Sequence, residues 1–246
     1  MQALVRSIED AGKWLVSLAL PPRCPGCGTI TAELHNFCAA CWRQIEWLGD
    51  AGCEACGQPL EATDVENCAA CLAKPPVITR TRAAVAYGDA TRTLPLRLKY
   101  SRKVALAKTM ARYMRPLLDV SREPVLVPVP LHRSRLWARG FNQSALLAAE
   151  LGRECGLDHD PFVLVRCKRT SALKGMSPTQ RKREVAGAFV VAGGAAIESR
   201  TVILVDDVLT TGSTANGCAK ALRRAGASRV DLICWARVVR PTQLVR

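Results

Sequence analysis

The sequence predicts an α/β protein in which a mostly parallel sheet with flanking helices follows a small zinc-binding domain. Eight cysteines form four regularly spaced Cys-x-x-Cys pairs between residues 24 and 71. Beyond residue 76, short apolar segments alternate with segments of helical periodicity, as in proteins whose parallel strands are joined by helices. One apolar segment, residues 202–205, leads directly into two aspartates and a hydroxyl-rich loop.

Composition and charge restrict the class of protein. Of the 246 residues, 49% are hydrophobic and only 5% aromatic, so aliphatic side chains must fill most of the core. No apolar run reaches the roughly 20 residues that span a bilayer, and no signal-peptide cleavage site is evident, so we expect a cytoplasmic protein without a transmembrane segment. Residues 1–76 carry a net charge of −4 and residues 77–246 a net charge of +18. The basic part favours an anionic partner, and the alternative is an ordinary solvated surface.

Residues 1–22 are expected to form an amphipathic helix. Apolar residues recur at helical spacing from Leu4 to Leu18, and Pro21 and Pro22 end the pattern. The apolar face suits packing against the rest of the protein. A membrane-surface or partner-docking helix is the less favoured alternative, because the polar face carries few cations.

Residues 23–76 are expected to form a double zinc ribbon. Each Cys-x-x-Cys turn brings two thiolates to one side, and two turns supply the four sulfurs of a tetrahedral site, so four turns predict two structural Zn²⁺ ions. Sequential pairing of the turns is the simplest arrangement, and interleaved pairing is the alternative. The spacers suit short hairpins. The predicted ligands are Cys24, Cys27, Cys38, Cys41, Cys53, Cys56, Cys68 and Cys71.

Other uses of these cysteines fit the pattern less well. A disulfide framework is disfavoured in a protein with no sign of secretion. A thioredoxin-like redox pair needs one Cys-x-x-Cys turn at a helix start rather than four in succession, and an iron–sulfur cluster is a third alternative. The remaining cysteines are expected to pack in the core as small apolar residues. They are Cys155, Cys167, Cys218 and Cys234.

Residues 77–246 are expected to form the α/β body, after a linker that ends in Pro75 and Pro76. The residue patterns predict strands at 83–87, 125–129, 162–165, 189–191, 202–205 and 230–236, and helices at 91–99, 103–118, 142–155 and 214–225. Strands that alternate with helices in this way imply a parallel sheet covered on both faces.

The segment VILVDDVLTTGST, residues 202–214, carries the predicted chemistry. Ligands of open α/β sheets bind beyond the carboxyl ends of the strands. A Thr/Gly/Ser loop at a helix N-terminus offers N–H groups, hydroxyls and the positive end of the helix dipole to a phosphate. Asp206 and Asp207 can accept hydrogen bonds from vicinal hydroxyls or hold a magnesium complex. This combination describes a ribose 5-phosphate, and the alternative is an ordinary strand–turn–helix with an acidic turn.

This segment resembles the 5-phosphoribosyl-1-pyrophosphate (PRPP) motif of type I phosphoribosyltransferases. The chain also carries the four cysteine pairs, VPVPL at residues 127–131 and RGFNQS at residues 139–144, in this order. Together these motifs resemble the ComF family of competence-associated phosphoribosyltransferase-like proteins, which includes the GntX type. The resemblance implies a type I phosphoribosyltransferase-like domain at residues 77–246. It also implies a link to DNA uptake or to the use of external DNA.

The resemblance also implies roles for individual residues. Asp206 and Asp207 would hold the ribose hydroxyls, and the 5-phosphate would be bound by Thr210, Thr211, Gly212, Ser213 and Thr214. Mg²⁺ would accompany PRPP. Candidates for the pyrophosphate side are Pro128, Val129, Pro130, Lys99, Arg139, Arg181 and Arg183. Enzymes that use 6-oxopurines carry an aspartate at the position of Thr210, so activity on hypoxanthine or guanine is not expected.

Two functions are compatible with these features. In the first, the protein binds PRPP and works in DNA uptake or competence, with single-stranded DNA on the basic body and proteins of the uptake machinery on the ribbons. Phe37, Trp42 and Trp47 are candidates for stacking on DNA bases. In the alternative, the protein is an active phosphoribosyltransferase of nucleotide salvage or metabolism, which displaces pyrophosphate from C1 of the ribose with a base or amine that the sequence does not identify.

Overall fold

The computed structural model describes residues 21–50, 52–60, 65–168, 180 and 186–239. The helix expected at residues 1–22 therefore lies almost wholly outside the described residues, as do Arg181 and Arg183. None of the described helices is long and apolar enough to cross a membrane.

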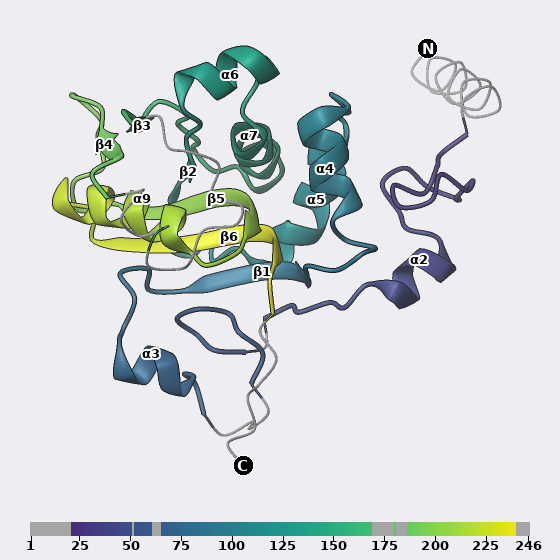
Figure 1. The fold of residues 1–246 in the computed structure, drawn as a ribbon, viewed down its shortest axis with the longest axis horizontal. Coiled ribbons are helices and arrows are strands. Elements are labelled where there is room, and N and C mark those ends of the chain that lie inside the picture. The colour runs from purple at the N-terminus through teal and green to yellow at the C-terminus, as the bar shows by residue number, and fades with distance from the viewer. Residues whose placement is uncertain (1–20, 51, 61–64, 169–179, 181–185, 240–246) are drawn as a thin grey trace, which may run out of the picture.

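A four-stranded parallel sheet forms the centre of the molecule, in the order β1-β6-β5-β2 (Figure 1). Its strands are β1 (Thr81–Ala86), β2 (Val125–Pro128), β5 (Thr201–Leu209) and β6 (Arg229–Arg237). The short strands β3 (Leu164–Arg166) and β4 (Phe189–Val191) form a separate antiparallel pair. The predicted mostly parallel sheet is confirmed.

Helices cover both faces of the sheet, as predicted. The helices α4 (Thr93–Tyr100), α5 (Leu106–Met114) and α7 (Gln143–Cys155) form one layer, and α9 (Ser213–Arg224) lies on the other face. Neighbouring residues of β5 point to opposite layers: Ile203 belongs to the α5/α7 core, whereas Leu204 belongs to the α9 core. A strand buried on both faces must be apolar at every position, which explains the continuous apolar run in β5.

Several elements differ from the prediction. β5 extends to Leu209 because β6 continues to pair with it as far as Arg237, so both aspartates lie inside the strand rather than after it. The helix expected at residues 103–118 is divided into α5 and the 3₁₀ turn η1 (Arg115–Leu117), in which Pro116 has no N–H to continue the helix. The short, solvent-facing helix α6 (Arg133–Arg139) was not predicted, since it has no buried residue to give it a periodic pattern.

Each ribbon contains a short helix that the sequence did not lead us to expect. α2 (Ala39–Gln44) and α3 (Ala69–Ala73) begin directly after Cys38 and Cys68. A single isolated antiparallel bridge, between Arg23 and Ile30, is what remains of a hairpin in the described part of the ribbons. A cysteine at a helix N-cap can accept from the first-turn N–H groups, as Cys38 Sγ does from the Cys41 N–H at 3.5 Å, and this favours a short helix at that point.

The two ribbons lie on different parts of the body (Figure 1). The first packs on α4 and α5, and the second, which contains α3, lies below β1. The chain between them follows the edge of the sheet: the N–H of Leu48 donates to the Ala84 carbonyl at 3.0 Å, and the N–H of Ala86 donates to the Glu46 carbonyl at 2.9 Å. These hydrogen bonds occupy the outer edge of β1, so this edge is not free to pair with a strand of another chain.

The burial of individual side chains corrects two predictions, one about base-stacking aromatic residues and one about cysteines in the core. Phe37 is buried against Tyr113 and Trp235, and Trp47 packs in the same cluster, so neither presents a ring for stacking on a base; only Trp42 stays exposed at its rim. These rings instead pack the first ribbon against the core of the body. Of the four remaining cysteines, Cys218 and Cys234 are buried, as expected; Cys155 is half-buried and Cys167 is exposed, which the core prediction did not anticipate.

Candidate ligand site and metal centres

The two predicted aspartates lie at the place where the sheet becomes narrower. β2 pairs with β5 only as far as Pro128, which lies opposite Val205. The N–H of Val129 makes one more hydrogen bond, to the Val205 carbonyl at 2.9 Å. Asp206 and Asp207 follow immediately, where β5 has lost its neighbour on that side. The structure therefore brings the predicted carboxylates and the predicted 128–130 turn together.

Asp207 is buried and is neutralised by a lysine. The Lys99 ammonium, at the end of α4, forms an ion pair with the Asp207 carboxylate, which is only 3% exposed. Gln143 Nε2 donates to the other carboxylate oxygen at 3.5 Å. Two adjacent carboxylates require such a counter-ion, because an unpaired buried charge is very costly. Lys99, predicted on the pyrophosphate side, thus lies beside the carboxylates.

Asp206 is only partly buried and is held by two donors. Ser144 Oγ donates to its Oδ1 at 3.0 Å, and the backbone N–H of Asp207 donates to the same oxygen at 2.9 Å. Desolvation, followed by the neighbouring charge of Asp207, raises the pKa of Asp206 to about 7, although Lys99 and the hydrogen bonds act in the opposite direction. A bound cation would favour the charged form of this carboxyl group.

The RGFNQS segment, residues 139–144, runs from the last residue of α6 into the first turn of α7. Asn142 caps the helix: its side-chain oxygen accepts from the Ser144 N–H at 3.0 Å, and its Nδ2 donates to the Val129 carbonyl at 3.0 Å. One side chain therefore fixes both the start of α7 and the peptide at the end of β2. This explains why an asparagine, a strong N-cap residue, stands at this position.

The following residues of this turn contact the aspartates. Gln143 and Ser144 bind Asp207 and Asp206 respectively, and both are buried. Arg139 Nη1 donates to Gln143 Oε1 at 2.5 Å. Gln143 and Ser144 were missing from the predicted site residues. Their position within RGFNQS, at the start of a helix that follows the neighbouring strand, was the signal that could have identified them.

The loop between β5 and α9 has the geometry expected of an anion-binding turn. Gly212 has a φ of 74°, in the left-handed region that favours glycine, and its carbonyl accepts from the N–H and the side-chain amide of Asn216 at 2.8 and 3.0 Å. No side chain at the N-cap occupies the first-turn N–H groups of α9. The hydroxyl oxygens of Thr211 and Ser213 lie 3.0 Å apart beside them. These groups can bind a phosphate.

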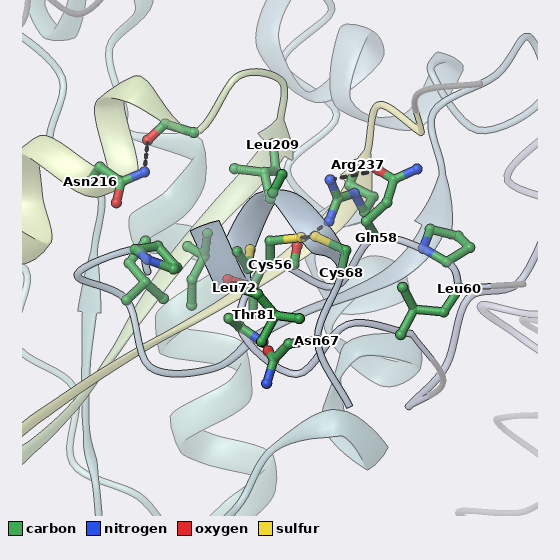
Figure 2. Close-up of a pocket in the computed structure, with 18 of the residues that line it drawn as sticks. Cys56, Gln58, Leu60, Asn67, Cys68, Leu72, Thr81, Leu209, Asn216 and Arg237 are labelled. Carbon is green, nitrogen blue, oxygen red and sulfur yellow. Dashed lines mark hydrogen bonds between the residues drawn. The ribbon is translucent and has the colours of Figure 1, made fainter. Parts of the chain in front are cut away.

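The same loop forms one side of a pocket of about 880 Å³ (Figure 2). The opposite side comes from the second ribbon, so the pocket lies between the two predicted domains. A volume of this size is typical of small-molecule sites. Residues that line it include Gln58, Leu60, Asn67 and Leu72 of the ribbon and Thr81, Leu209, Thr210, Asn216 and Arg237 of the body.

The eight ribbon cysteines form two sequential groups. Within each group the sulfur atoms lie within 4.8 Å of one another, and the groups are Cys24, Cys27, Cys38 and Cys41, then Cys53, Cys56, Cys68 and Cys71.

Both groups fit Zn²⁺. The Sγ–Sγ distances of 3.6 Å for Cys27–Cys38 and 3.8 Å for Cys56–Cys68 match the roughly 3.8 Å edge of a tetrahedron whose Zn–S bonds are about 2.3 Å. The two Cys₄ clusters therefore fit two structural zinc ions.

Comparison with known proteins agrees with this architecture. Residues 15–72 match the family described as Double zinc ribbon domain. The chain is 32% identical over 232 residues to the DNA utilization protein YhgH of Escherichia coli (strain K12), covering 90% of this chain and 100% of that protein. The chain belongs to the ComF family. A further member, Competence protein F of Haemophilus influenzae, is 30% identical over 224 residues, covering 87% of this chain and 96% of that protein.

Among solved structures, the ComF-family chain overlaps with the glutamine PRPP amidotransferase of B. subtilis complexed with ADP and GMP. The overlap has a TM-score of 0.37 and 20% identity and covers 52% of this chain and 25% of that chain. The resemblance to the ComF family and the zinc ribbon, both predicted from sequence, are confirmed by the family comparisons.

Proposed function

We propose that this ComF-family protein binds PRPP, or a related phosphoribosyl ligand, with Mg²⁺, and that it serves in DNA utilization or competence, as its relatives are named. The observation that carries the ligand proposal is the pair of carboxylates in β5, directly before the glycine-capped N-terminus of α9. One end of this arrangement suits a diol or a magnesium ion, and the other end suits a phosphate.

The two aspartates are suited to different tasks. Asp207 is buried and paired with Lys99, so it can hold one ribose hydroxyl in a fixed position. Asp206 is partly exposed, so it can accept from the second hydroxyl or bind a magnesium complex. The 5-phosphate would accept hydrogen bonds from the α9 N–H groups and the surrounding hydroxyls, in residues Thr210, Thr211, Gly212, Ser213 and Thr214.

The pyrophosphate would lie on the β2 side. The peptides of Pro128, Val129 and Pro130 are held against the end of β5, next to Arg139 and Lys99. A guanidinium has five donors, and Arg139 uses one of them on Gln143, so others can reach phosphate oxygens. Arg181 and Arg183 remain candidates from the sequence alone.

Titration calorimetry with PRPP and Mg²⁺ tests the ligand proposal. The wild-type protein is expected to bind, and Asp206→Asn and Asp207→Asn should each weaken binding by about tenfold or more, equivalent to about 1.4 kcal/mol. Asp119→Asn is the control, because Asp119 is bound locally by Ser121 and lies outside the site. An absence of binding by the wild-type protein would overturn the proposal.

An active phosphoribosyltransferase is the second candidate, favoured by the cations Lys99 and Arg139 beside the carboxylates. A nitrogen of the acceptor would attack C1 of the ribose, the bond from C1 to the pyrophosphate oxygen would break, and the acceptor proton would pass to solvent. Donors fixed around the leaving group would stabilise the developing charge. Pyrophosphate release with a panel of bases and amines distinguishes an enzyme from a binding protein, and Thr210 leads us to expect none with hypoxanthine or guanine.

An exposed aromatic and basic surface near the site suits single-stranded DNA. Trp137 on α6 is 91% exposed, and Tyr100 at the end of α4 is 74% exposed, with the Arg139 guanidinium 5.8 Å from the Tyr100 ring centroid. Exposed rings between cations can stack on bases while the cations bind the backbone. This surface replaces the buried Phe37 and the half-buried Trp47 as the proposed contact.

Titration with a fluorescent single-stranded oligonucleotide tests the DNA surface. Trp137→Ala should weaken binding by about fivefold or more, since stacking contributes about 1–3 kcal/mol per base. Phe162→Ala removes another exposed ring, two residues before β3, and should leave the affinity unchanged. Affinity should fall steeply with salt. Binding that is indifferent to salt and to Trp137→Ala would contradict the proposed surface.

A further inference from the structure

The second Cys₄ cluster is connected to the end of β6 by a buried arginine. Arg237 is the last residue of β6 and is 7% exposed. Its Nη1 donates to the backbone carbonyl of Cys56, a ligand of the second cluster, and its Nη2 donates to Gln58 Oε1 at 3.0 Å. These contacts cross the wall of the pocket shown in Figure 2. The backbone carbonyl of a cluster ligand is therefore a hydrogen-bond acceptor for a buried guanidinium.

The same strand end holds the base of the candidate phosphate loop. Leu209 lies opposite Arg237 in the β5–β6 register, and the N–H of Val238 donates to the Leu209 carbonyl at 2.8 Å. Thr210 follows directly. A continuous set of contacts thus runs from Cys56 through Arg237 and Val238 to Leu209, and from there into the loop.

The cysteine turn of the second cluster also sits directly on the sheet. A Cβ at Gly57 would lie 2.7 Å from the Thr81 carbonyl oxygen, and the N–H of Thr81 donates to the Glu54 carbonyl at 3.2 Å. The buried Arg82 forms ion pairs with Asp50 and Glu54. A change in the shape of this turn therefore has to move β1, Arg237 or both.

Among the residues that the structure describes, no hydrogen bond joins the first ribbon to β5, β6 or the 210–214 loop. Its ribbon contacts α4 and α5: Arg97 Nη1 donates to the Pro25 carbonyl at 3.0 Å, and His35 hydrogen-bonds Thr109 at 2.8 Å. No residue of the described range 21–50 lines the pocket. The two clusters have the same ligands but differ in what they support.

We propose that metal in the second Cys₄ cluster and ligand on the 210–214 loop are thermodynamically coupled, each raising the other's affinity, and that the first cluster takes no part in this coupling. The proposal rests on the proposed ligand site. Without metal, the turn at Cys53 and Cys56 relaxes and Arg237 loses a fixed acceptor, so the strand end and the loop lose their fixed position. The ligand must then order the loop itself, which lowers its affinity. Linkage makes the effect reciprocal.

Zinc release from the wild-type protein tests the coupling directly. A zinc-selective colorimetric chelator should remove two zinc ions in two phases, which Cys41→Ser and Cys71→Ser assign to the first and second cluster. PRPP with Mg²⁺ should slow release from the second cluster by about fivefold or more and leave the first unchanged, within the usual range of allosteric coupling. If PRPP binds but slows both phases equally, or neither, the proposal is wrong.

A ligand-free measurement separates this proposal from the ligand site itself. Hydrogen exchange of the peptide that covers residues 205–216 should increase in Cys71→Ser and not in Cys41→Ser. Arg237→Met should raise it by a similar factor while both zinc ions are retained, because this variant breaks the connection and not the cluster. Hydrogen exchange of strand β2, residues 125–128, is the control for folding of the body. It should stay unchanged in all three variants.

The outcomes are distinguishable. If the loop exchanges equally in all variants, the coupling is rejected whether or not PRPP binds. If the loop responds to Cys71→Ser and Arg237→Met but the wild-type protein does not bind PRPP, the proposed ligand is wrong and the metal–loop connection stands. If Cys71→Ser does not fold, Arg237→Met and the wild-type release kinetics decide.

Discussion

The two zinc ribbons share one local geometry and differ in their surroundings. In both, a backbone N–H of the third cysteine approaches the sulfur of the first at 3.3 Å, from Cys38 to Cys24 and from Cys68 to Cys53. The first ribbon places Phe37 in an aromatic cluster on the α5 layer, whereas the second is held by buried arginines at the sheet and faces the pocket. The ligands determine that a metal binds, and the surrounding contacts determine what its loss would disturb.

Metal removal should give the largest effects and should separate the ribbons. The protein is expected to contain two zinc ions per chain, and Cys41→Ser and Cys71→Ser should each lose one, since structural zinc contributes about 10 kcal/mol or more to such sites. Only Cys41→Ser should change the near-ultraviolet circular dichroism strongly, because the aromatic cluster packs on the first ribbon. Fewer than two zinc ions in the wild-type protein would contradict the double-ribbon assignment.

The next-largest effects should come from the ionic contacts of the ribbons, and the second ribbon should lose more stability than the first. Arg82→Met removes a buried guanidinium that binds Asp50 and Glu54, and should lower the free energy of unfolding by about 2–3 kcal/mol. Arg112→Met removes an exposed contact between α5 and Glu33 of the first ribbon, 3.8 Å apart, and should cost less than about 1 kcal/mol. Urea denaturation measures both, and equal losses would contradict the distinction.

Equivalent glycines provide a closely matched test. Gly28 and Gly57 follow the second cysteine of each ribbon, with φ of 84° and 68°. Alanine at either position should cost about 1–2 kcal/mol in the left-handed region. Only at Gly57 would the new Cβ meet backbone, 2.7 Å from the Thr81 oxygen, whereas nothing lies within 4 Å at Gly28. Gly57→Ala should therefore destabilise the protein by about 1 kcal/mol more than Gly28→Ala in thermal unfolding, by the usual cost of overpacking.

The candidate ligand site differs from both ribbons because a substitution there should stabilise the protein. The pKa of Asp206 is about 7 in the folded protein and its ordinary value is 3.8, so the fold favours the protonated form. In the wild-type protein, the contribution of Asp206 to the free energy of unfolding is fully present below about pH 4. It is lost as the pH rises to about 7. Asp206→Asn stays neutral, so its free energy of unfolding should rise relative to wild type by about 1–2 kcal/mol over that range. The difference should not increase further above it.

Urea denaturation at pH 4, 5, 6, 7 and 8 measures this gain. Asp119→Asn should show the opposite sign, since hydrogen bonds from Ser121 lower the pKa of Asp119. In the wild-type protein, PRPP affinity should increase as the pH rises through about 7, because the ligand needs the charged form of Asp206. A pH-independent difference between Asp206→Asn and wild type would show that the carboxyl group titrates normally.

The predictions from sequence succeeded where a periodic or motif pattern records a local requirement. Alternating strands and helices indicated the parallel sheet, and Cys-x-x-Cys spacing indicated two metal clusters. The predictions failed where tertiary contacts decide. α6 is solvent-facing and has no apolar pattern, and β5 extends past its apolar run because β6 continues to pair with it. Phe37 was assigned to DNA because exposure cannot be read from residue type.

The sequence by itself determined the classes of chemistry available: thiolate clusters for zinc, a carboxylate pair and a phosphate-type loop, all encoded in neighbouring residues. Only the tertiary structure decided which distant groups act on them. Lys99 and Gln143 reach Asp207 from α4 and α7, and Arg237 links the second cluster to the base of the loop. The physical reason is that coordination turns and helix caps form between neighbours in the chain. Counter-ions and buried hydrogen-bond partners are selected by packing among segments far apart in sequence.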